Sequence, residues 1–273
     1  LDGVNVSVDR KSGPTYKSRQ YRARQLFLGA EGQIGAWAYR LEGGAANGSA
    51  WAWDDAVIEY KTKGGMLLTL GNQKVAGLEN LTSTRFTTFM DRGPYGDFGV
   101  DSYLLGVVGK YSGYNYSMSL GVQGASLNST DVANASADSK ERLTVTARGH
   151  YALLNTDADK LHLAVSYRYR NRGDEGAFAY TGRTNTAYSN ATFYTTGGIG
   201  NRDKTIAVEG AWVHGPLSVQ AEYSNIDVTR AGTAGRRSPS SERPTPTSMA
   251  MIMPGIMPKL ERAEKRPPIW GSP

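Results

Sequence analysis

The stretch KLHLAVSYRYRNR, residues 160–172, decides the fold of this chain. One set of alternate positions is apolar or aromatic: Leu161, Leu163, Val165, Tyr167 and Tyr169. The other set is polar or basic and includes His162, Ser166, Arg168, Arg170 and Arg172. Successive side chains of a β-strand point to opposite faces, so this period of two predicts a strand with one apolar and one polar face.

The same alternation recurs along most of the chain. It is strongest in residues 37–42, 114–123, 142–151 and 217–223, and no segment of the sequence sustains the spacing of an amphipathic helix. About eleven candidate strands lie between residues 2 and 228, and several reach the roughly 9 to 11 residues of a tilted transmembrane strand. The sequence therefore predicts an all-β protein.

The connections between these strands alternate in length. Short turns are expected near residues 32–33, 62–65, 112–113, 155–159 and 215–216. Longer polar connections are expected over residues 43–50, 75–99, 125–140 and 171–203. Outer-membrane barrels have short periplasmic turns, long outer loops and an up-and-down order of antiparallel strands. The pattern favours this architecture over a soluble sandwich.

The direction of the alternation separates a membrane barrel from a water-soluble one. A lipocalin-like barrel points its apolar residues inward. Here eleven or more strands would enclose a lumen too wide to fill with side chains, and Tyr and Trp gather near the strand ends, as in an interfacial aromatic girdle. We therefore expect a transmembrane antiparallel up-and-down β-barrel with its apolar face outward and its polar face toward the lumen.

The composition excludes several other classes of protein. The 273 residues include no Cys, which excludes disulfides, thiolate metal sites and cysteine nucleophiles. No run approaches the roughly 18 to 20 apolar residues of a membrane-spanning helix. The first residues, Leu1 to Val4, have no basic or apolar region of an export signal, so a mature protein or a fragment is expected.

The composition changes near Arg230. Residues 231–273 hold eight of the eleven prolines, four of the seven methionines, and seven Lys or Arg against three acids. Segments of this kind are commonly disordered, and a frame-shifted ending would look the same. We expect a barrel domain over residues 1–230, lacking its last strands, and a basic Pro- and Met-rich tail over 231–273. Because most of the +6 net charge lies in the tail, no nucleic-acid partner is expected.

Motifs for enzymatic chemistry are missing from the sequence. It contains no Walker loop, GxSxG elbow or HExxH. His150, His162 and His214 lie in three different strands without the spacing of metal ligands. Asp54 and Asp55 are adjacent and would point to opposite faces. We expect no enzyme, no metal and no cofactor.

Arginines line the predicted inner face. If the apolar residues of 160–172 face lipid, Arg168, Arg170 and Arg172 face the lumen, spaced about 6.8 Å apart. The same parity turns Arg142 and Arg148 inward on the preceding strand, and neither strand has an inward acid. Guanidinium groups stay charged and offer forked donors to phosphate oxygens, so these five residues resemble a ladder for anions. Alternatively, they only hydrate the wall or pair with loop acids such as Asp174 and Glu175.

Other charges lie elsewhere on the predicted barrel. Lys74, Arg85 and Arg92 belong to the long connection 75–99 or its flank, which could fold into the pore or remain a solvated loop. Arg40 faces inward with Glu42 beside it, which predicts self-neutralisation. Glu209, Gln220 and Glu222 are expected to make another part of the lumen acidic.

Several motifs are similar to one known family. They are AVIEY at 56–60, LGNQKVAGLENLTSTR at 70–85, FMDR at 89–92, WAYRLE at 37–42, YRNRGD at 169–174, TGGI at 196–199 and HGPLS at 214–218 followed by Tyr223. The chain from about residue 21 to 230 resembles the phosphate-selective porin O and P family. The resemblance implies a trimeric barrel of sixteen strands in the bacterial outer membrane that passes anions along arginines of the wall, with basic residues at a constriction.

The sequence departs from that family in two places. A run of closely spaced arginines near the start is represented by Arg22 and Arg24, with Gln25 and Phe27 where further basic residues are expected. After Arg230 the remaining strands and the terminal aromatic residue of outer-membrane barrels are missing or replaced.

Two classes of function remain open from the sequence. The first is an outer-membrane porin for passive diffusion of phosphate or related small anions, with lipid around it and a homotrimeric assembly. The second is a structural or ligand-binding β-protein without conductance, including an incomplete barrel.

Overall fold

The computed structural model describes residues 2–8, 16–22, 25–46, 50–75, 103–128, 142–173, 176–183, 192–229 and 255–256 of the chain. The secondary structure of this described part is β throughout, in agreement with the period of two in the sequence. No helix among the described residues is long and apolar enough to cross a membrane.

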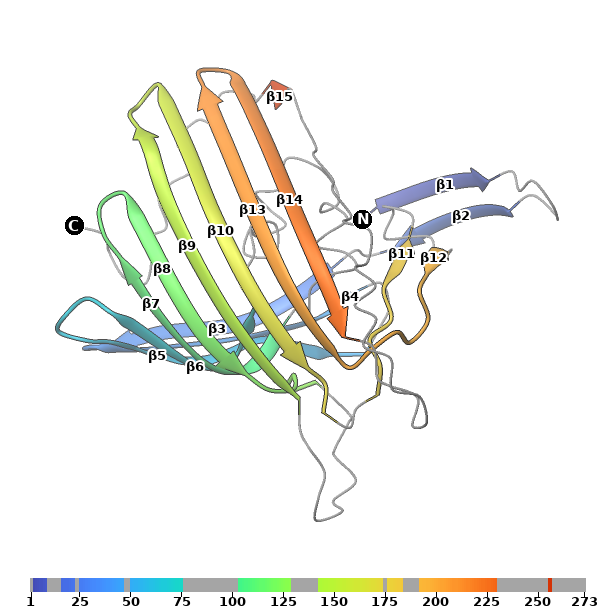
Figure 1. The fold of residues 1–273 in the computed structure, drawn as a ribbon, viewed down its shortest axis with the longest axis horizontal. Coiled ribbons are helices and arrows are strands. Elements are labelled where there is room, and N and C mark those ends of the chain that lie inside the picture. The colour runs from blue at the N-terminus through green and yellow to red at the C-terminus, as the bar shows by residue number, and fades with distance from the viewer. Residues whose placement is uncertain are drawn as a thin grey trace, which may run out of the picture.

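Most strands belong to one continuous antiparallel sheet (Figure 1). Its eleven strands follow chain order from one edge to the other, apart from the small hairpin between β10 and β13. They are β3 (Gln25–Ile34), β4 (Trp37–Ala46), β5 (Ala52–Lys61), β6 (Leu67–Lys74), β7 (Tyr103–Ser112), β8 (Tyr116–Gln123), β9 (Leu143–Asn155), β10 (Asp159–Asn171), β13 (Arg202–His214), β14 (Leu217–Thr229) and the two-residue β15 (Gly255–Ile256). The predicted up-and-down order of strands is therefore confirmed.

The sheet is strongly curved. In Figure 1, β7 to β14 stand upright while β3 to β6 turn away and run across their lower end. Among the described residues the edge strands β3 and β15 do not pair with each other, so this part of the sheet is an open, barrel-like wall. Two further pairs form separate small sheets, β1 (Asp2–Val8) with β2 (Tyr16–Arg22) and β11 (Thr181–Arg183) with β12 (Thr192–Thr195).

From β5 to β14, short turns and long connections alternate along the main sheet, as the sequence predicts. The connection expected over residues 43–50 is shorter than predicted, because β4 continues to Ala46 and β5 begins at Ala52. The first turn is an exception in its position, because it lies at Gly35 and Ala36 and not near residues 32–33. Gly35 has a φ of 60°, which suits the turn. Gly32 is instead a strand residue opposite Tyr39, and a Cβ there would lie 2.6 Å from the Tyr39 ring. The aromatic ring therefore covers the glycine across the strand pair.

The two faces of the sheet have opposite polarity, and the polar face is the buried one. Large apolar side chains on alternate positions are exposed: β10 exposes Leu163 and Val165, and β13 exposes Ile206 and Val208. Among the described residues, the buried polar set is twice as numerous as the buried apolar set and consists of Glu59, Thr69, Asn72, Gln73, Gln123, Thr144, Thr146, Ser166, Arg168, Arg170, Asp203, Thr205, Glu209 and Ser218. A water-soluble protein has the reverse arrangement.

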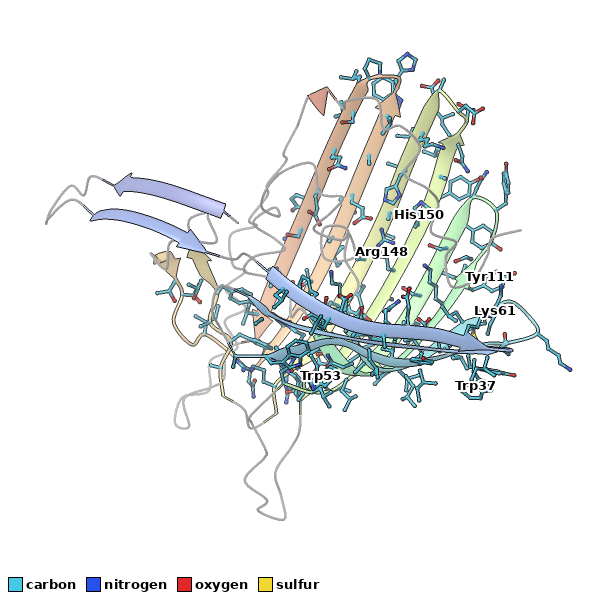
Figure 2. All side chains as sticks on the ribbon, turned by 180° about the vertical axis from the view of Figure 1, so that it is seen from behind. Trp37, Trp53, Lys61, Tyr111, Arg148 and His150 are labelled. Atoms are coloured by element: carbon cyan, nitrogen blue, oxygen red, sulfur yellow. The ribbon has the colours of Figure 1, made fainter. Side chains whose placement is uncertain are left out.

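Figure 2 follows the two faces at labelled positions, with Arg148 and His150 on one face and Trp37 and Trp53 on the other. The apolar face has aromatic pairs near both ends of the strands. Trp37 contacts Tyr60 at the end with the short turns, with 4.7 Å between ring centroids, and Trp51 contacts Trp53 at the opposite end, with 6.1 Å. Aromatic residues in these positions are typical of the two interfaces of a membrane barrel.

Candidate anion pathway

The inner face of β10 is the centre of the candidate site. Ser166, Arg168 and Arg170 alternate with the exposed apolar residues and are buried, with only 3% of Arg168 and 5% of Arg170 exposed. Antiparallel pairing places β9 on one side of them and β13 on the other. The two arginines therefore lie in the middle of a three-strand wall.

Arg168 lies one inward position nearer the short turns than Arg170 and contacts both neighbouring strands. The Arg168 Nη2 donates to the Thr205 hydroxyl of β13 over 3.1 Å. On the β9 side, Thr146 is the residue opposite Arg168, and Arg148 is opposite Ser166. Arg148 thus shares the face of Arg168, one inward position further along, as the alternation of the sequence predicts.

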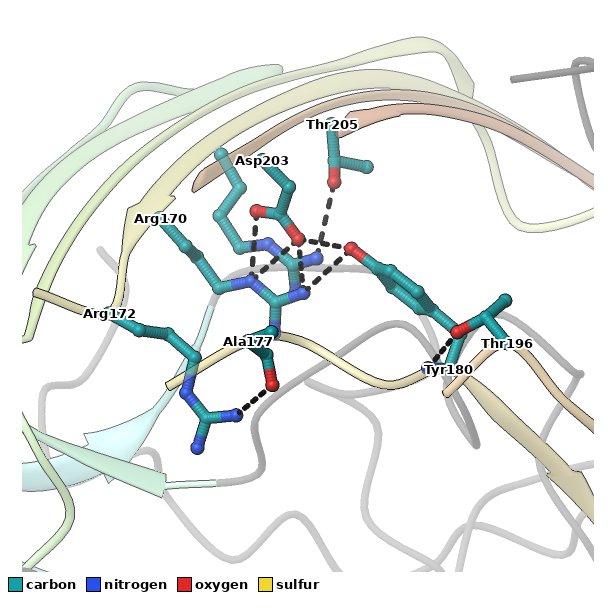
Figure 3. Close-up of polar contacts among 8 residues, drawn as sticks. Arg170, Arg172, Ala177, Tyr180, Thr196, Asp203 and Thr205 are labelled. Atoms are coloured by element: carbon teal, nitrogen blue, oxygen red, sulfur yellow. Dashed lines mark hydrogen bonds and ion pairs between the residues drawn. The ribbon is translucent and has the colours of Figure 1, made fainter. Parts of the chain in front are cut away.

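Arg170 is held by a cluster of side chains near the long connection (Figure 3). Its Nε donates to both carboxylate oxygens of Asp203, the opposite residue on β13, over 3.0 Å each, and its Nη2 also pairs with Asp203. The Tyr180 hydroxyl donates to the same carboxylate and accepts from Arg170 Nη2 over 3.3 Å. The guanidinium lies 4.3 Å above the Phe178 ring, a cation–π distance.

Tyr180 and Phe178 come from the connection between β10 and β13. Phe178 pairs with Gly200 in an isolated β-bridge, and the Tyr180 backbone N–H donates to the Thr196 hydroxyl over 3.0 Å. These bonds fix the loop against the wall, so both aromatic side chains are buried. Burial, together with the neighbouring Asp203 carboxylate, raises the pKa of Tyr180, so its hydroxyl stays protonated and can donate.

Arg172 lies just beyond the end of β10 and contacts the same loop. Its Nη1 donates to the Ala177 carbonyl over 3.2 Å, and its guanidinium lies 5.3 Å from the Phe178 ring centroid. Arg142 directly precedes β9 and is half-buried. The five arginines expected on the wall therefore lie on or at the ends of two paired strands.

The wall is less uniformly basic than β9 and β10 suggest. Neither strand has an inward acid, but β13 brings Asp203 against Arg170 and Glu209 against Arg148. Glu209 also accepts from His162 Nε2 over 3.0 Å. The acid that the sequence placed in another part of the lumen is therefore a neighbour of the arginines, because β13 follows β10 in the sheet.

Two residues of the site, Asp203 and Tyr180, did not stand out in the sequence. Asp203 occupies the inward parity of β13 with Thr205 and Glu209, opposite the exposed Ile206 and Val208, so the alternation of that strand could have indicated it. Tyr180 lies in an irregular connection, and no periodicity marks it.

The remaining candidate cations are apart from this wall or beyond the described residues. Lys74 ends β6, with its Nζ 5.6 Å from the Tyr103 ring centroid. Arg40 pairs with Asp55 of β5 over 3.1 Å, whereas the sequence suggested Glu42. Arg22 is the last residue of β2, and the structure describes only its strand. The expected sites Arg24, Arg85 and Arg92, and the loop acids Asp174 and Glu175, lie outside the described residues.

No group of three or more His, Asp or Glu that could hold a metal ion occurs within the described residues. The structure does bring together two of the histidines that the sequence separates. The rings of His150 and His162 lie 4.3 Å apart between centroids, on adjacent strands of the inner face. His214 is on the opposite face and pairs with Asp159.

An apolar outer face with aromatic residues near both ends and a polar inner face are typical of outer-membrane β-barrel proteins. The chain belongs to the phosphate-selective porin O and P family, whose model matches residues 5–241. A curated relative, Porin O of Pseudomonas aeruginosa, is 26% identical over 242 residues that cover 78% of this chain and 53% of the relative. The chain therefore spans about half the length of that relative. Membership in this family indicates a location in the bacterial outer membrane.

Proposed function

We propose that this protein forms a water-filled pore for the passive diffusion of small anions, phosphate or related oxyanions among them. The observation that carries the proposal is the excess of arginine on the inner face of β9, β10 and β13. Arg142, Arg148, Arg168, Arg170 and Arg172 lie along a wall whose carboxylates on these strands are Asp203 and Glu209. A positive wall raises the local concentration of anions and slows cations.

Different arginines contribute differently in this proposal. Arg170 is fixed by Asp203, Tyr180 and Phe178, so it anchors the loop and adds little net charge. Arg168 donates to the Thr205 hydroxyl, and Arg148 is the more exposed member of its ion pair, with 13% of its side chain exposed. We choose Arg148 and Arg168 for the test because they lie one inward position apart on the β9–β10 pair.

The lipid and the assembly also follow from this proposal. The exposed apolar face of β10 and β13 would contact the acyl chains, and a homotrimer is the assembly that the family resemblance implies. The molecular mass of the protein in detergent, measured by light scattering, tests the trimer. A monomeric mass would contradict it.

The reversal potential in a KCl gradient across a planar bilayer tests the pore. The protein is expected to prefer chloride over potassium, and the double change Arg148→Gln and Arg168→Gln is expected to lower that preference about twofold or more, because it removes two charges from the wall. Adding phosphate is expected to block chloride current less in the double variant. Arg170 is left intact, since its loss would leave the buried Asp203 carboxylate without the cation that pairs with it.

The matched control is Lys204→Gln, because Lys204 lies on the exposed face of β13, between the inward Asp203 and Thr205. It should leave the reversal potential unchanged. An unaltered preference in the double variant, with folding verified by heat-modifiable migration in electrophoresis, would mean that the arginines only hydrate the wall. A folded protein without conductance would favour a structural or ligand-binding role.

A further inference from the structure

A basic hollow lies at the end of the wall with the short turns. It has a volume of about 390 Å³ and is lined by residues of β7, β8, β9 and β10 and of the turns that join them. Its basic and titratable nitrogen groups come from Lys110, His150, Lys160 and His162. None of the residues that line it in the described structure is Asp or Glu.

The two histidines form a compact pair within this hollow. His150 is opposite Ala164 and His162 is opposite Ala152, so the two rings are diagonal neighbours across the β9–β10 pair and come to 4.3 Å. His150 Nδ1 lies 3.5 Å from the Ser117 hydroxyl, and His162 Nε2 lies 3.0 Å from a carboxylate oxygen of Glu209. Each ring therefore has one nitrogen oriented by a neighbouring strand.

Charged groups and hydroxyl groups of the surrounding strands face the histidine pair. They are Lys110 from β7, Ser117 and Ser119 from β8, Arg148 from β9, Lys160 from β10, Glu209 from β13 and Glu222 from β14. The Glu209 carboxylate is shared by Arg148 and His162, which ties the charge of the pair to the arginine wall. With neutral histidines, three cations stand against two carboxylates, so protonating both rings adds two positive charges to a nearly balanced surface.

Histidine is the side chain that ordinarily changes charge between pH 5 and 8. Two imidazolium rings at this distance repel each other. An oxyanion in the hollow would offset that repulsion and accept hydrogen bonds from both rings.

We propose that the His150–His162 pair, with Lys110 and Lys160, is a second anion-binding position whose affinity for small oxyanions rises when the histidines are protonated. This inference rests on the proposed anion pore and adds a proton-dependent step to it. The pore would then hold anions at its turn end more strongly in acidic medium than in alkaline medium.

Sulfate is the suitable probe because it remains a dianion across this pH range, whereas phosphate itself titrates. The sulfate concentration that halves the chloride current in a planar bilayer is expected to be about threefold lower at pH 5.5 than at pH 8. In the double variant His150→Gln and His162→Gln the two concentrations should be equal. His214→Gln is the matched control, since the third histidine lies on the outer face, and it should behave as the unaltered protein.

Two further measurements keep the outcomes distinct. Lys110→Gln should weaken sulfate block at both pH values and preserve the ratio between them. Proton NMR of the protein in micelles should show sulfate shifting the ring signals of His150 and His162 and leaving those of His214 in place. A pH-dependent block that persists in the double histidine variant, or ring signals that do not respond, overturns this inference. If the unaltered protein shows no preference for chloride at pH 8, the result counts against the proposed pore and not against the histidine site.

Discussion

Two arginine–carboxylate pairs share β13, and they differ in how tightly the surrounding chain holds them. Arg170 and Asp203 are directly opposite residues of neighbouring strands, with 6% and 0% of their side chains exposed. Arg148 and Glu209 belong to β9 and β13, with β10 between them, and 13% and 3% of their side chains are exposed. The first pair is a sealed structural contact and the second is a partly open one.

The reason for the difference lies on β10 and in the loop after it. Glu209 is opposite Ala164, and Arg148 is opposite Ser166, so only small side chains stand between the two charges. Near the long connection, Phe178 and Tyr180 cover Arg170 instead. The same chemistry thus fastens a loop at one end of the wall and forms a less fully buried ion pair further along it.

The largest expected effect is on the sealed pair. Asp203→Asn would leave the Arg170 guanidinium buried without its carboxylate, which should lower the free energy of unfolding by about 3 to 5 kcal/mol. Urea unfolding in detergent or lipid measures the change. Asp227→Asn is the matched control, since Asp227 is exposed on β14 and should change stability little. Equal stability of the two variants would show that Asp203 does not hold Arg170.

A substitution in the Arg148–Glu209 pair should change the charge of the wall more than it changes the stability of the protein. Glu209→Gln retains hydrogen-bonding oxygen and nitrogen atoms beside Arg148 and His162, so a loss of only about 1 to 2 kcal/mol is expected. The same change removes a negative charge from the wall, so the chloride-to-potassium permeability ratio should rise. If the permeability ratio falls or stays constant in a variant with normal heat-modifiable migration, the charge of the Arg148–Glu209 pair does not act on anions in the pore.

The sequence predicted the wall better than it predicted these partners. The period of two in residues 160–172 fixed which side chains of β10 share a face, because a pleated strand leaves no other choice. The turn at residues 155–159 brought β9 beside β10, and an irregularity in their pairing between Leu161 and His162 then placed Arg148 opposite Ser166. The contribution of the wall arginines to anion selectivity stays a prediction.

The sequence alone could not predict the register of two strands that are joined by a long connection. About thirty residues separate Asn171 from Arg202, so their register and the contacts of Phe178 and Tyr180 depend on how the connection folds. Irregularities in the ladder also break the simple parity. One lies between Leu161 and His162 in the β9–β10 pair, and another lies between Leu41 and Gly43 in the β4–β5 pair. The second irregularity accompanies the unexpected pairing of Arg40 with Asp55.

The smallest expected effect concerns the loop that seals Arg170. Tyr180→Phe removes one hydroxyl from the buried cluster while Asp203 and Arg170 remain paired, so the free energy of unfolding should fall by about 1 kcal/mol. Because burial and the Asp203 carboxylate raise the pKa of Tyr180, folding favours the protonated phenol. That stabilisation is complete below the ordinary tyrosine pKa near 10 and is lost as the pH rises beyond it. Urea unfolding at pH 7, 9 and 11 should therefore show a constant difference between the unaltered protein and the variant up to about pH 9. At pH 11 the difference should be smaller, and one that grows there would mean that the hydroxyl does not donate to Asp203.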